Sequence, residues 1–150
     1  MFIKKLVTVS VLSSVISVIG SLSMILLLSQ NVHAADLTIK INDIEKGKGH
    51  LLIALYEGVE AYDSGKADYS SKVKAENTQE SVTFKDLADG EYAIKMYQDE
   101  NDNNKLDTNL LGIPKEGYGF SNNAGMFGAP KYKKAKFTVK DNTVIEIGLF

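Results

Sequence analysis

Oxygen-bearing side chains recur at alternate residues in one polar stretch of the chain, as in the first part of an EF-hand-type calcium loop. Calcium binds six to eight oxygens at about 2.3–2.6 Å, so a chain that wraps around the ion must present an oxygen at every second residue. Side chains supply these oxygens at positions 1, 3, 5 and 9, and a backbone carbonyl supplies one at position 7. The predicted calcium ligands are Asp99, Asn101, Asn103, Lys105 (through its carbonyl) and Asp107.

The residues between and after these ligands refine the prediction. Asn104 stands at position 6, where the turn needs a left-handed backbone, and asparagine adopts this conformation more readily than most residues. Leu106 is expected to anchor the loop in the core, whereas Leu110 stands where a complete EF-hand has its bidentate glutamate. Glu116 or Asn109 would then complete the shell. Because only two ligands are carboxylates, we expect a weak site, with a dissociation constant of about 10⁻⁴–10⁻³ M.

The same stretch has a second interpretation, as a solvated acidic turn. Asn and Asp favour turns because their side chains form hydrogen bonds with nearby backbone groups, and these bonds need no metal. The spacing of the oxygens is compatible with both interpretations. The sequence therefore leaves open a loop that binds calcium and a turn that binds nothing.

A second segment, 112–130, is unusual in composition. It contains five of the twelve glycines and both prolines, interleaved with Tyr118, Phe120 and Phe127. Such a stretch is not expected to form a regular strand or helix, and its aromatic side chains, which favour burial, argue against disorder. It is either an ordered binding loop for a glycan or peptide, or an Ω-type loop whose rings cover one end of the domain. The candidate ligand-binding residues are Glu116, Tyr118, Phe120, Asn122 and Asn123.

The elements that must position these segments are predicted to be short strands. Strict alternation across 36–42 indicates a half-buried strand, and the continuous apolar run 50–56 indicates a central one. The polar stretch 57–68 is expected to be a long surface loop. About seven strands without a long amphipathic helix predict an all-β fold, an antiparallel two-sheet sandwich of the immunoglobulin-like kind. The remaining strands are expected at 72–75, 81–84, 91–97, 132–139 and 143–150.

Two patterns resemble known proteins. The run 84–92 places a leucine in a turn, a glycine at its bend and a tyrosine at the start of the next strand. It resembles the strand–turn–strand of transthyretin-like and carboxypeptidase-regulatory-like sandwich domains. Segments 99–107 and 112–123 resemble a family of small secreted bacterial proteins known as a domain of unknown function, and the resemblance covers 37–150. It implies a transthyretin-like sandwich, and it implies no established activity, ligand or catalytic residue.

The amino-terminal segment is typical of a secretory signal peptide. Lys4 and Lys5 precede an uncharged apolar stretch, and a small-x-small cleavage pattern follows at 32–34. The chain is therefore expected to consist of a cleaved signal peptide, 1–34, and a β-sandwich domain, 35–150. The apolar run is also long enough to span a bilayer, so an uncleaved anchor is the alternative. In both cases the domain is exported, periplasmic or extracellular, and the mature chain contains no membrane span.

Charge and composition exclude several classes of function. Two of the 17 basic residues and none of the 19 acidic residues lie in the first 34, which leaves a net charge of −4 without any arginine. Such a domain is not expected to bind nucleic acid. The absence of cysteine excludes disulfides, thiolate zinc sites and a cysteine nucleophile. The mature chain has one histidine, His50, and no hydrolase or phosphate-loop motif, so we do not expect an enzyme.

These observations predict an exported, non-catalytic β-sandwich that binds calcium weakly at the 99–107 loop and presents the 112–130 loop for recognition. Only four residues separate Asp107 from Gly112, so ordering the first loop should restrict the second. Two alternatives remain. One is a purely structural, envelope-associated module without a ligand, and the other is a saccharide or peptide binder that needs no metal.

Overall fold

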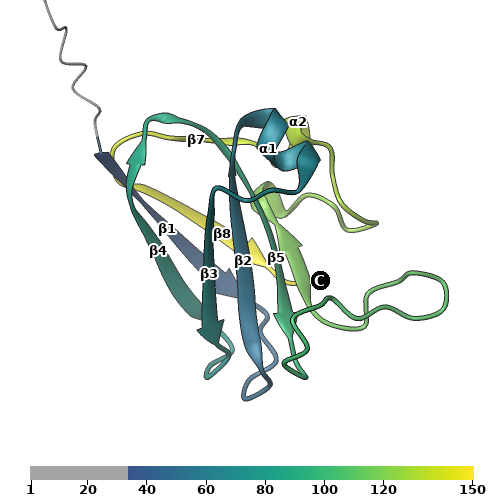
Figure 1. Cartoon of the computed structure of the whole chain (residues 1–150). Coiled ribbons are helices and arrows are strands. Elements are labelled where there is room, and N and C mark those ends of the chain that lie inside the picture. The colour runs from purple at the N-terminus through teal and green to yellow at the C-terminus, as the bar shows by residue number, and fades with distance from the viewer. Residues whose placement is uncertain (1–33) are drawn as a thin grey trace, which may run out of the picture. The chain divides into compact units, whose positions relative to one another are not determined.

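The computed structural model describes residues 34–150, which form two β-sheets packed face to face (Figure 1). The predicted signal peptide therefore lies outside the described residues, except for Ala34. The prediction of an all-β, two-sheet sandwich is confirmed. The strands are β1 (Ala34–Asn42), β2 (His50–Glu57), β3 (Tyr69–Lys74), β4 (Glu80–Ala88), β5 (Gly90–Asp99), β6 (Tyr118–Phe120), β7 (Phe137–Val139) and β8 (Thr143–Gly148).

One sheet has the strand order β4-β1-β8, and the other has the order β3-β2-β5-β6, with β7 also paired to β5. All these pairs are antiparallel except one: β1 and β8 run parallel, from Leu37 opposite Thr143 to Asn42 opposite Gly148. The prediction of a wholly antiparallel sandwich was therefore wrong at this pair. The reason lies in the connection, because β8 reaches β1 from β7 in the other sheet and no hairpin fixes its direction.

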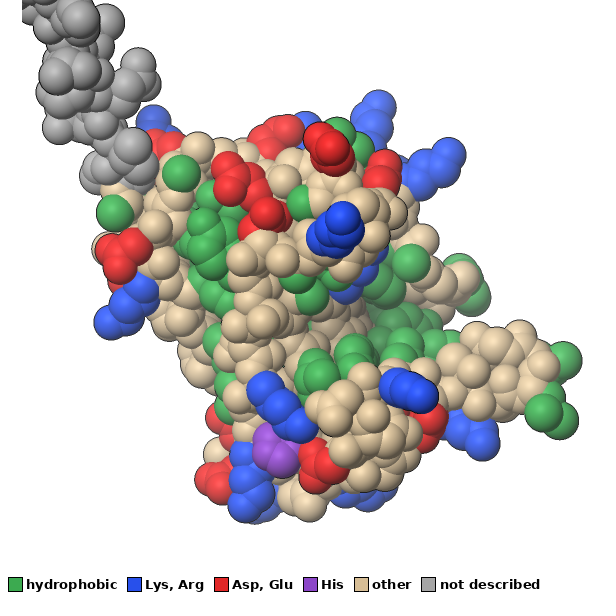
Figure 2. Space-filling model, viewed as in Figure 1, with side chains coloured by type: hydrophobic (Ala, Val, Ile, Leu, Met, Phe, Trp, Pro, Cys, Tyr) green, Lys and Arg blue, Asp and Glu red, His purple; other side chains and the backbone are tan. Residues whose placement is uncertain are grey.

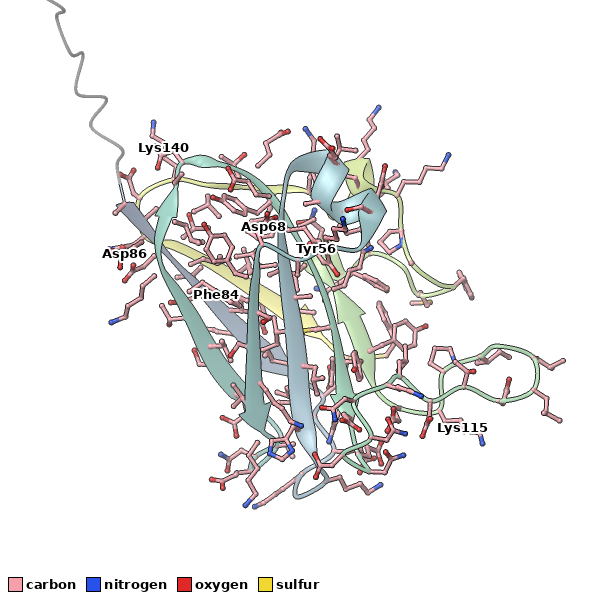
Figure 3. All side chains as sticks on the ribbon, viewed as in Figure 1. Tyr56, Asp68, Phe84, Asp86, Lys115 and Lys140 are labelled. Atoms are coloured by element: carbon pink, nitrogen blue, oxygen red, sulfur yellow. The ribbon has the colours of Figure 1, made fainter. Side chains whose placement is uncertain are left out.

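The core lies between the two sheets and is built from alternate residues of their central strands. Leu37 and Ile39 of β1 and Leu51 and Leu55 of β2 have no exposed surface. Phe84 points from β4 into the same interior (Figure 3). Each fully buried side chain of this size contributes about 1.5–3 kcal/mol relative to exposure, so the period-two pattern stabilises both sheets.

The turn between β4 and β5 carries the chain from one sheet to the other. Leu87 fills the corner with no exposed surface, and the hydroxyl of Tyr92 donates a 3.0 Å hydrogen bond to the carbonyl of Ala88. A tyrosine that reaches back a few residues in this way is a recurrent corner device of β-sandwiches. The roles predicted for the leucine and the tyrosine are thus confirmed.

Short helices occupy two places where the sequence predicted none. The expected surface loop at 57–68 contains α1 (Gly58–Ser64), and the strand expected at 132–139 begins as α2 (Tyr132–Ala135). Both helices lie over the same sheet (Figure 1). They form because Tyr62 and Tyr132 pack together with Tyr56 in a second hydrophobic cluster outside the main core, a tertiary contact that outweighs the alternating lysine pattern.

Candidate functional site

Strand β5 ends at Asp99, and this carboxylate organises the acidic loop that follows. Asp99 is fully buried, and its two oxygens accept hydrogen bonds from the backbone N–H groups of Asn103 (3.0 Å) and Asn104 (2.8 Å). The chain can turn toward it because Asn104 has a φ of 59°, the left-handed conformation predicted for position 6. The side chain of Asp99, the first predicted calcium ligand, therefore holds the loop closed by binding the backbone of residues 103 and 104.

The next two predicted ligands repeat this geometry. The Oδ1 of Asn101 accepts the N–H of Asn103 at 3.1 Å, and the Oδ1 of Asn103 accepts the N–H of Lys105 at 2.7 Å. Their amide nitrogens both donate to Oδ2 of Asp107, at 2.6 and 3.1 Å. Each carbonyl-type oxygen has two lone pairs, so a single N–H leaves capacity for a further donor or a cation.

Glu116 joins the same loop from the following segment. Its side chain is 6% exposed, and its two oxygens accept the N–H groups of Glu100 (3.0 Å) and Asp107 (2.8 Å). One carboxylate thus holds both ends of the loop. Asn109, the other candidate for completing the shell, instead accepts the N–H groups of Leu111 and Ile113 and stabilises the next turn.

The charges of the loop leave three carboxylates without a basic partner. Among residues 34–150, no ion pair involves Asp99, Asp107 or Glu116, whereas the neighbouring Glu100 and Asp102 pair with Lys48 and Lys72. No three acidic or histidine side chains of the described chain gather closely enough to hold a metal by themselves. A cation at this loop would therefore also need the two asparagine oxygens and the Lys105 carbonyl, and this mixed oxygen set fits calcium.

The turn between β1 and β2 packs directly against the start of the acidic loop. Gly49 has a φ of +56°, and a Cβ placed on it would lie 1.8 Å from the backbone carbonyl oxygen of Asp99. Only glycine fits there, since a side chain would collide with the start of the loop. Gly47, in the same turn, also has a positive φ but has open space around it.

The 112–130 segment is not one continuous loop. It contains strand β6 and a 3₁₀ turn, η1 (Ser121–Asn123), so the expectation that it forms no regular element was wrong. Strand β6 can form here because its central residue is Gly119. A Cβ on Gly119 would lie 2.9 Å from the side chain of Ile147, so only a residue without a side chain lets β6 pack this closely against β8. Burial of the aromatic residues is also only partial, because Phe120 is 8% exposed whereas Phe127 is 98% exposed.

The five candidate binding residues separate into three places. Glu116 belongs to the acidic loop, and Tyr118 and Phe120 line a groove on the sheet. The amide of Asn122 donates to the carbonyls of Lys134 and Lys136, and Asn123 accepts the N–H of Gly148. The last two asparagines therefore fasten the chain to α2 and β8, away from the groove.

The groove lies on the outer face of the β3-β2-β5-β6 sheet. It has a volume of about 530 Å³, within the range of roughly 300–1,000 Å³ that small-molecule sites occupy. The acidic loop and the α1–α2 helices lie at opposite ends of β5, and hydrophobic side chains gather on the face between them (Figure 2). Its lining residues are Leu52, Ile53, Ala54, Tyr56, Ser70, Ser71, Lys72, Lys95, Met96, Tyr97, Leu106, Tyr118 and Phe120.

Leu106 connects the acidic loop to this groove. The sequence predicted that Leu106 would anchor the loop in the core, but it is only half-buried and lines the groove instead. The prediction was wrong because the loop leaves β5 on the outer side of the sheet, where the main core cannot be reached. The position of Leu106 therefore depends on the conformation of the acidic loop.

Sequence reasoning missed the groove residues Leu52, Lys95 and Tyr97. A usable signal was present, because the apolar run 50–56 is continuous and so places apolar side chains on both faces of β2. Helices α1 and α2 cover only the end of the outer face near Tyr56, and the rest is left open.

Lys95 stands at the helical end of the groove among tyrosine rings. Its Nζ donates a 2.8 Å hydrogen bond to the carbonyl of Tyr62, and lies 3.9 Å from the Tyr62 ring centroid and 4.9 Å from that of Tyr56. Burial lowers the pKa of Lys95, against an opposing effect of Asp63. Burial also raises the pKa of Tyr62 to about 12, with smaller contributions from neighbouring negative groups.

A turn between the acidic loop and β6 projects from the body of the domain (Figure 1). Its base is closed by a bridge between Thr108 and Pro114, and Lys115 lies beside it (Figure 3). At its tip Leu110 and Leu111 are 104% and 84% exposed. Two large apolar side chains are thus held in solvent by an ordered turn.

The fold and the site define a class: a two-sheet β-sandwich with an oxygen-rich acidic loop at one end of an open apolar groove. Residues 39–146 match the family described as "Uncharacterized protein conserved in bacteria (DUF2141)", and the chain belongs to this family. No curated protein and no solved structure matches the chain. Within the part of the chain that the structure describes, no helix is long and apolar enough to cross a membrane.

Proposed function

We propose that this protein is an exported, non-catalytic binding module whose 99–107 loop takes up calcium weakly and thereby fixes one wall of the ligand site. The observation that carries the proposal is the hydrogen bonding of the loop. Oxygens of Asp99, Asn101 and Asn103 each accept a backbone N–H from further along the loop, which is how a chain wraps to present oxygens to one centre. Calcium would supply the positive charge that Asp107 and Glu116 lack.

Several contacts couple this loop to the recognition segment. The carbonyl of Asp107 accepts the N–H of Lys115 at 2.8 Å, and Glu116 is held at both ends of the loop. The chain then continues directly into β6, which carries Tyr118 into the groove. A cation bound by the loop would therefore fix the positions of Leu106 and Tyr118, which both line the groove.

Export and the finer fold assignment belong to the same proposal. The signal-like segment supports secretion to the periplasm or the exterior, where calcium is available to a weak site. The hydrogen bond from Tyr92 to Ala88 supports an immunoglobulin-like or transthyretin-like sandwich, since such corners recur in that architecture. The mostly apolar lining of the groove, with two serines and two lysines as its polar members besides the tyrosine hydroxyls, supports a binding role over a catalytic one.

One observation favours a different function, a structural envelope-associated module without a ligand. Asn122 and Asn123 were expected to recognise a ligand, but their side chains form hydrogen bonds with backbone groups of α2 and β8. The same contacts are compatible with a binder whose groove lies elsewhere on the sheet. A direct binding measurement separates the two functions.

Isothermal titration of calcium into residues 35–150 tests the proposal, because every residue of both described hydrophobic clusters lies within that range. We expect one site with a dissociation constant of about 10⁻⁴–10⁻³ M. Asp107→Asn should weaken binding about tenfold or more, since a ligand charge is lost. Asp89→Asn removes the same charge at the opposite end of β5 and should leave binding unchanged.

Three results would contradict the proposal. Heat of binding below the detection limit at millimolar calcium would exclude a useful site. Equal affinity for magnesium and calcium would indicate nonspecific screening of the negative loop, because magnesium demands a tighter octahedral site. Equal weakening by Asp107→Asn and Asp89→Asn would show that net charge, and not the loop, attracts the ion.

A further inference from the structure

We propose that the groove on the outer sheet binds a single-chain anionic amphiphile, an acyl chain that ends in a carboxylate, with Lys95 as the partner of the anionic group. The inference goes beyond the calcium proposal and does not depend on it. It rests on the shape of the groove, the polarity of its lining and the position of its two lysines.

The shape suits one extended chain. Leu52, Ala54 and Tyr56 line the groove along β2, opposite in register to the core residues of that strand. Four residues of strand span about 13 Å, at about 3.3 Å per residue. At one end the groove is lined by Leu106 of the acidic loop and by Tyr118 of β6. At the other end Tyr56 packs against α1 (Figure 3). The groove therefore runs along the strands, from one end of the sheet to the other.

The lining favours an apolar ligand over a saccharide. Nine of its thirteen side chains are aliphatic or aromatic, and the remaining four are two serines and two lysines. No side-chain carboxylate or amide is present to pair with the many hydroxyl groups of a sugar, and an unpaired buried hydroxyl is costly. An acyl chain makes no such demand and gains free energy from every methylene group that leaves water.

The charges favour an anion at one end of that chain. Lys95 forms no ion pair among residues 34–150, and only one of its three N–H donors is used, on the carbonyl of Tyr62. Its ammonium group is half-buried against two rings, so it lacks part of its hydration. A carboxylate would accept a charge-assisted hydrogen bond from the N–H groups of Lys95 that have no acceptor atom, within an apolar surrounding.

The second lysine of the groove is a weaker partner. Lys72 is exposed, and its Nζ already lies 3.2 Å from Oδ1 of Asn104 and 3.7 Å from Oδ1 of Asp102. A further anion near Lys72 would face the acidic loop. The carboxylate is therefore assigned to the Lys95 end, and the tail of the chain to the wall formed by Leu106.

The test uses sodium laurate below its micelle concentration, titrated into the domain in the presence of chelator, with 1-dodecanol as the neutral probe of matched length. We expect laurate to bind at least about tenfold more tightly than dodecanol. Lys95→Met should remove that preference by weakening laurate about tenfold, whereas Lys95→Arg should retain it. Lys140→Met, a lysine in the β7–β8 turn away from the groove (Figure 3), is the matched control and should bind as the wild type does.

The outcomes that overturn the proposal are distinct from those that affect calcium. Equal binding of laurate and dodecanol, or laurate binding unchanged in Lys95→Met, would remove Lys95 as the anion partner. No binding of either probe by a domain that unfolds cooperatively would exclude an acyl ligand. If Lys95→Met itself unfolds, Leu52→Asp decides, because a carboxylate in the groove should repel laurate much more than dodecanol. Because chelator is present throughout, failure of the calcium site leaves this test intact.

Discussion

At the scale of single residues, Asp99 determines the shape of the acidic loop. Its carboxylate is buried at the end of β5 and accepts two backbone N–H groups, whereas Asp107 is half-buried and accepts only side-chain amides. Both aspartates would bind the same cation, but without a cation they should differ in how much each contributes to the free energy of unfolding. This difference can be measured in the absence of metal.

We predict that Asp99→Asn lowers the free energy of unfolding by about 1–3 kcal/mol in chelator, because an amide NH₂ replaces one of two buried acceptors. Asp107→Asn should cost less than about 1 kcal/mol, since its partners are more exposed. Urea unfolding of the two variants checks the order. Equal losses, or a larger loss at Asp107, would show that Asp99 does not organise the loop.

Tyr62 gives a prediction for alkaline pH. Its pKa is raised from 10.0 to about 12 in the folded protein, chiefly by burial, and its hydroxyl donates to the carbonyl of Pro130. Since the unfolded chain loses this proton first, the stability linked to Tyr62 is complete below pH 10 and is lost as the pH rises to 12. Urea unfolding across this interval should show a smaller decline in Tyr62→Phe than in the wild type. An identical decline in both would rule out Tyr62 as a source.

At the scale of elements, the β1–β2 turn, the acidic loop and β6 form one connected end of the sandwich. Gly49 lies against the carbonyl of Asp99, and Glu116 connects the loop to the segment that enters β6. Close contact between backbones transmits displacement directly, because no flexible side chain lies between them. A change in the turn should therefore reach the loop.

Gly49→Ala and Gly47→Ala test this contact as a matched pair, since both glycines have positive φ but only Gly49 has a neighbour within reach of a Cβ. We predict that Gly47→Ala costs about 1 kcal/mol from backbone strain alone and that Gly49→Ala costs at least about 1 kcal/mol more. Chemical denaturation measures the difference. Equal costs would mean that the turn moves away freely and does not support the loop.

In the projecting turn at 108–114, by contrast, we predict that substitutions have almost no effect on stability. Leu110 and Leu111 bury almost nothing, so replacing both with serine should change the free energy of unfolding by less than about 0.5 kcal/mol. Thermal unfolding of the double variant against the wild type is sufficient. A clear destabilisation would show that these side chains are buried in solution, for example against another copy of the chain.

At the scale of the whole molecule, the sequence predicted what depends on local pattern. Alternation revealed the strands that contain Leu37 and Tyr92, and the oxygen spacing revealed a loop that does close on Asp99. The parallel β1–β8 pair and helix α2 were not predictable in this way, because each depends on residues far apart in the chain. The continuous apolar run 50–56 indicated two apolar faces of β2, but not the other strands and loops that line the groove. Leu106 illustrates the limit: its apolar character indicated burial but not on which side of the sheet.

The boundary of the domain has a consequence for export. The bond between Ala34 and Ala35 lies in β1, where Ala35 is 1% exposed and pairs with Leu87. If a signal peptidase cleaves this bond, as the proposed export requires, cleavage would have to precede the folding of β1, because the bond is buried and paired once the strand has formed. We predict that amino-terminal sequencing of the protein recovered from its native cells begins at Ala35. A chain that still begins at Met1 would support the uncleaved anchor.

The most direct test of the central claim is thermal unfolding of residues 35–150 in chelator, in about 10 mM calcium and in the same concentration of magnesium. If the dissociation constant is about 0.1 mM, calcium should add about 2.7 kcal/mol of stability by mass action. For a domain of this size that corresponds to a rise of about 10 °C in Tm. We predict that rise in calcium alone and its loss in Asp107→Asn. An unchanged Tm in calcium, or the same rise with magnesium, would contradict a calcium loop at the end of the groove.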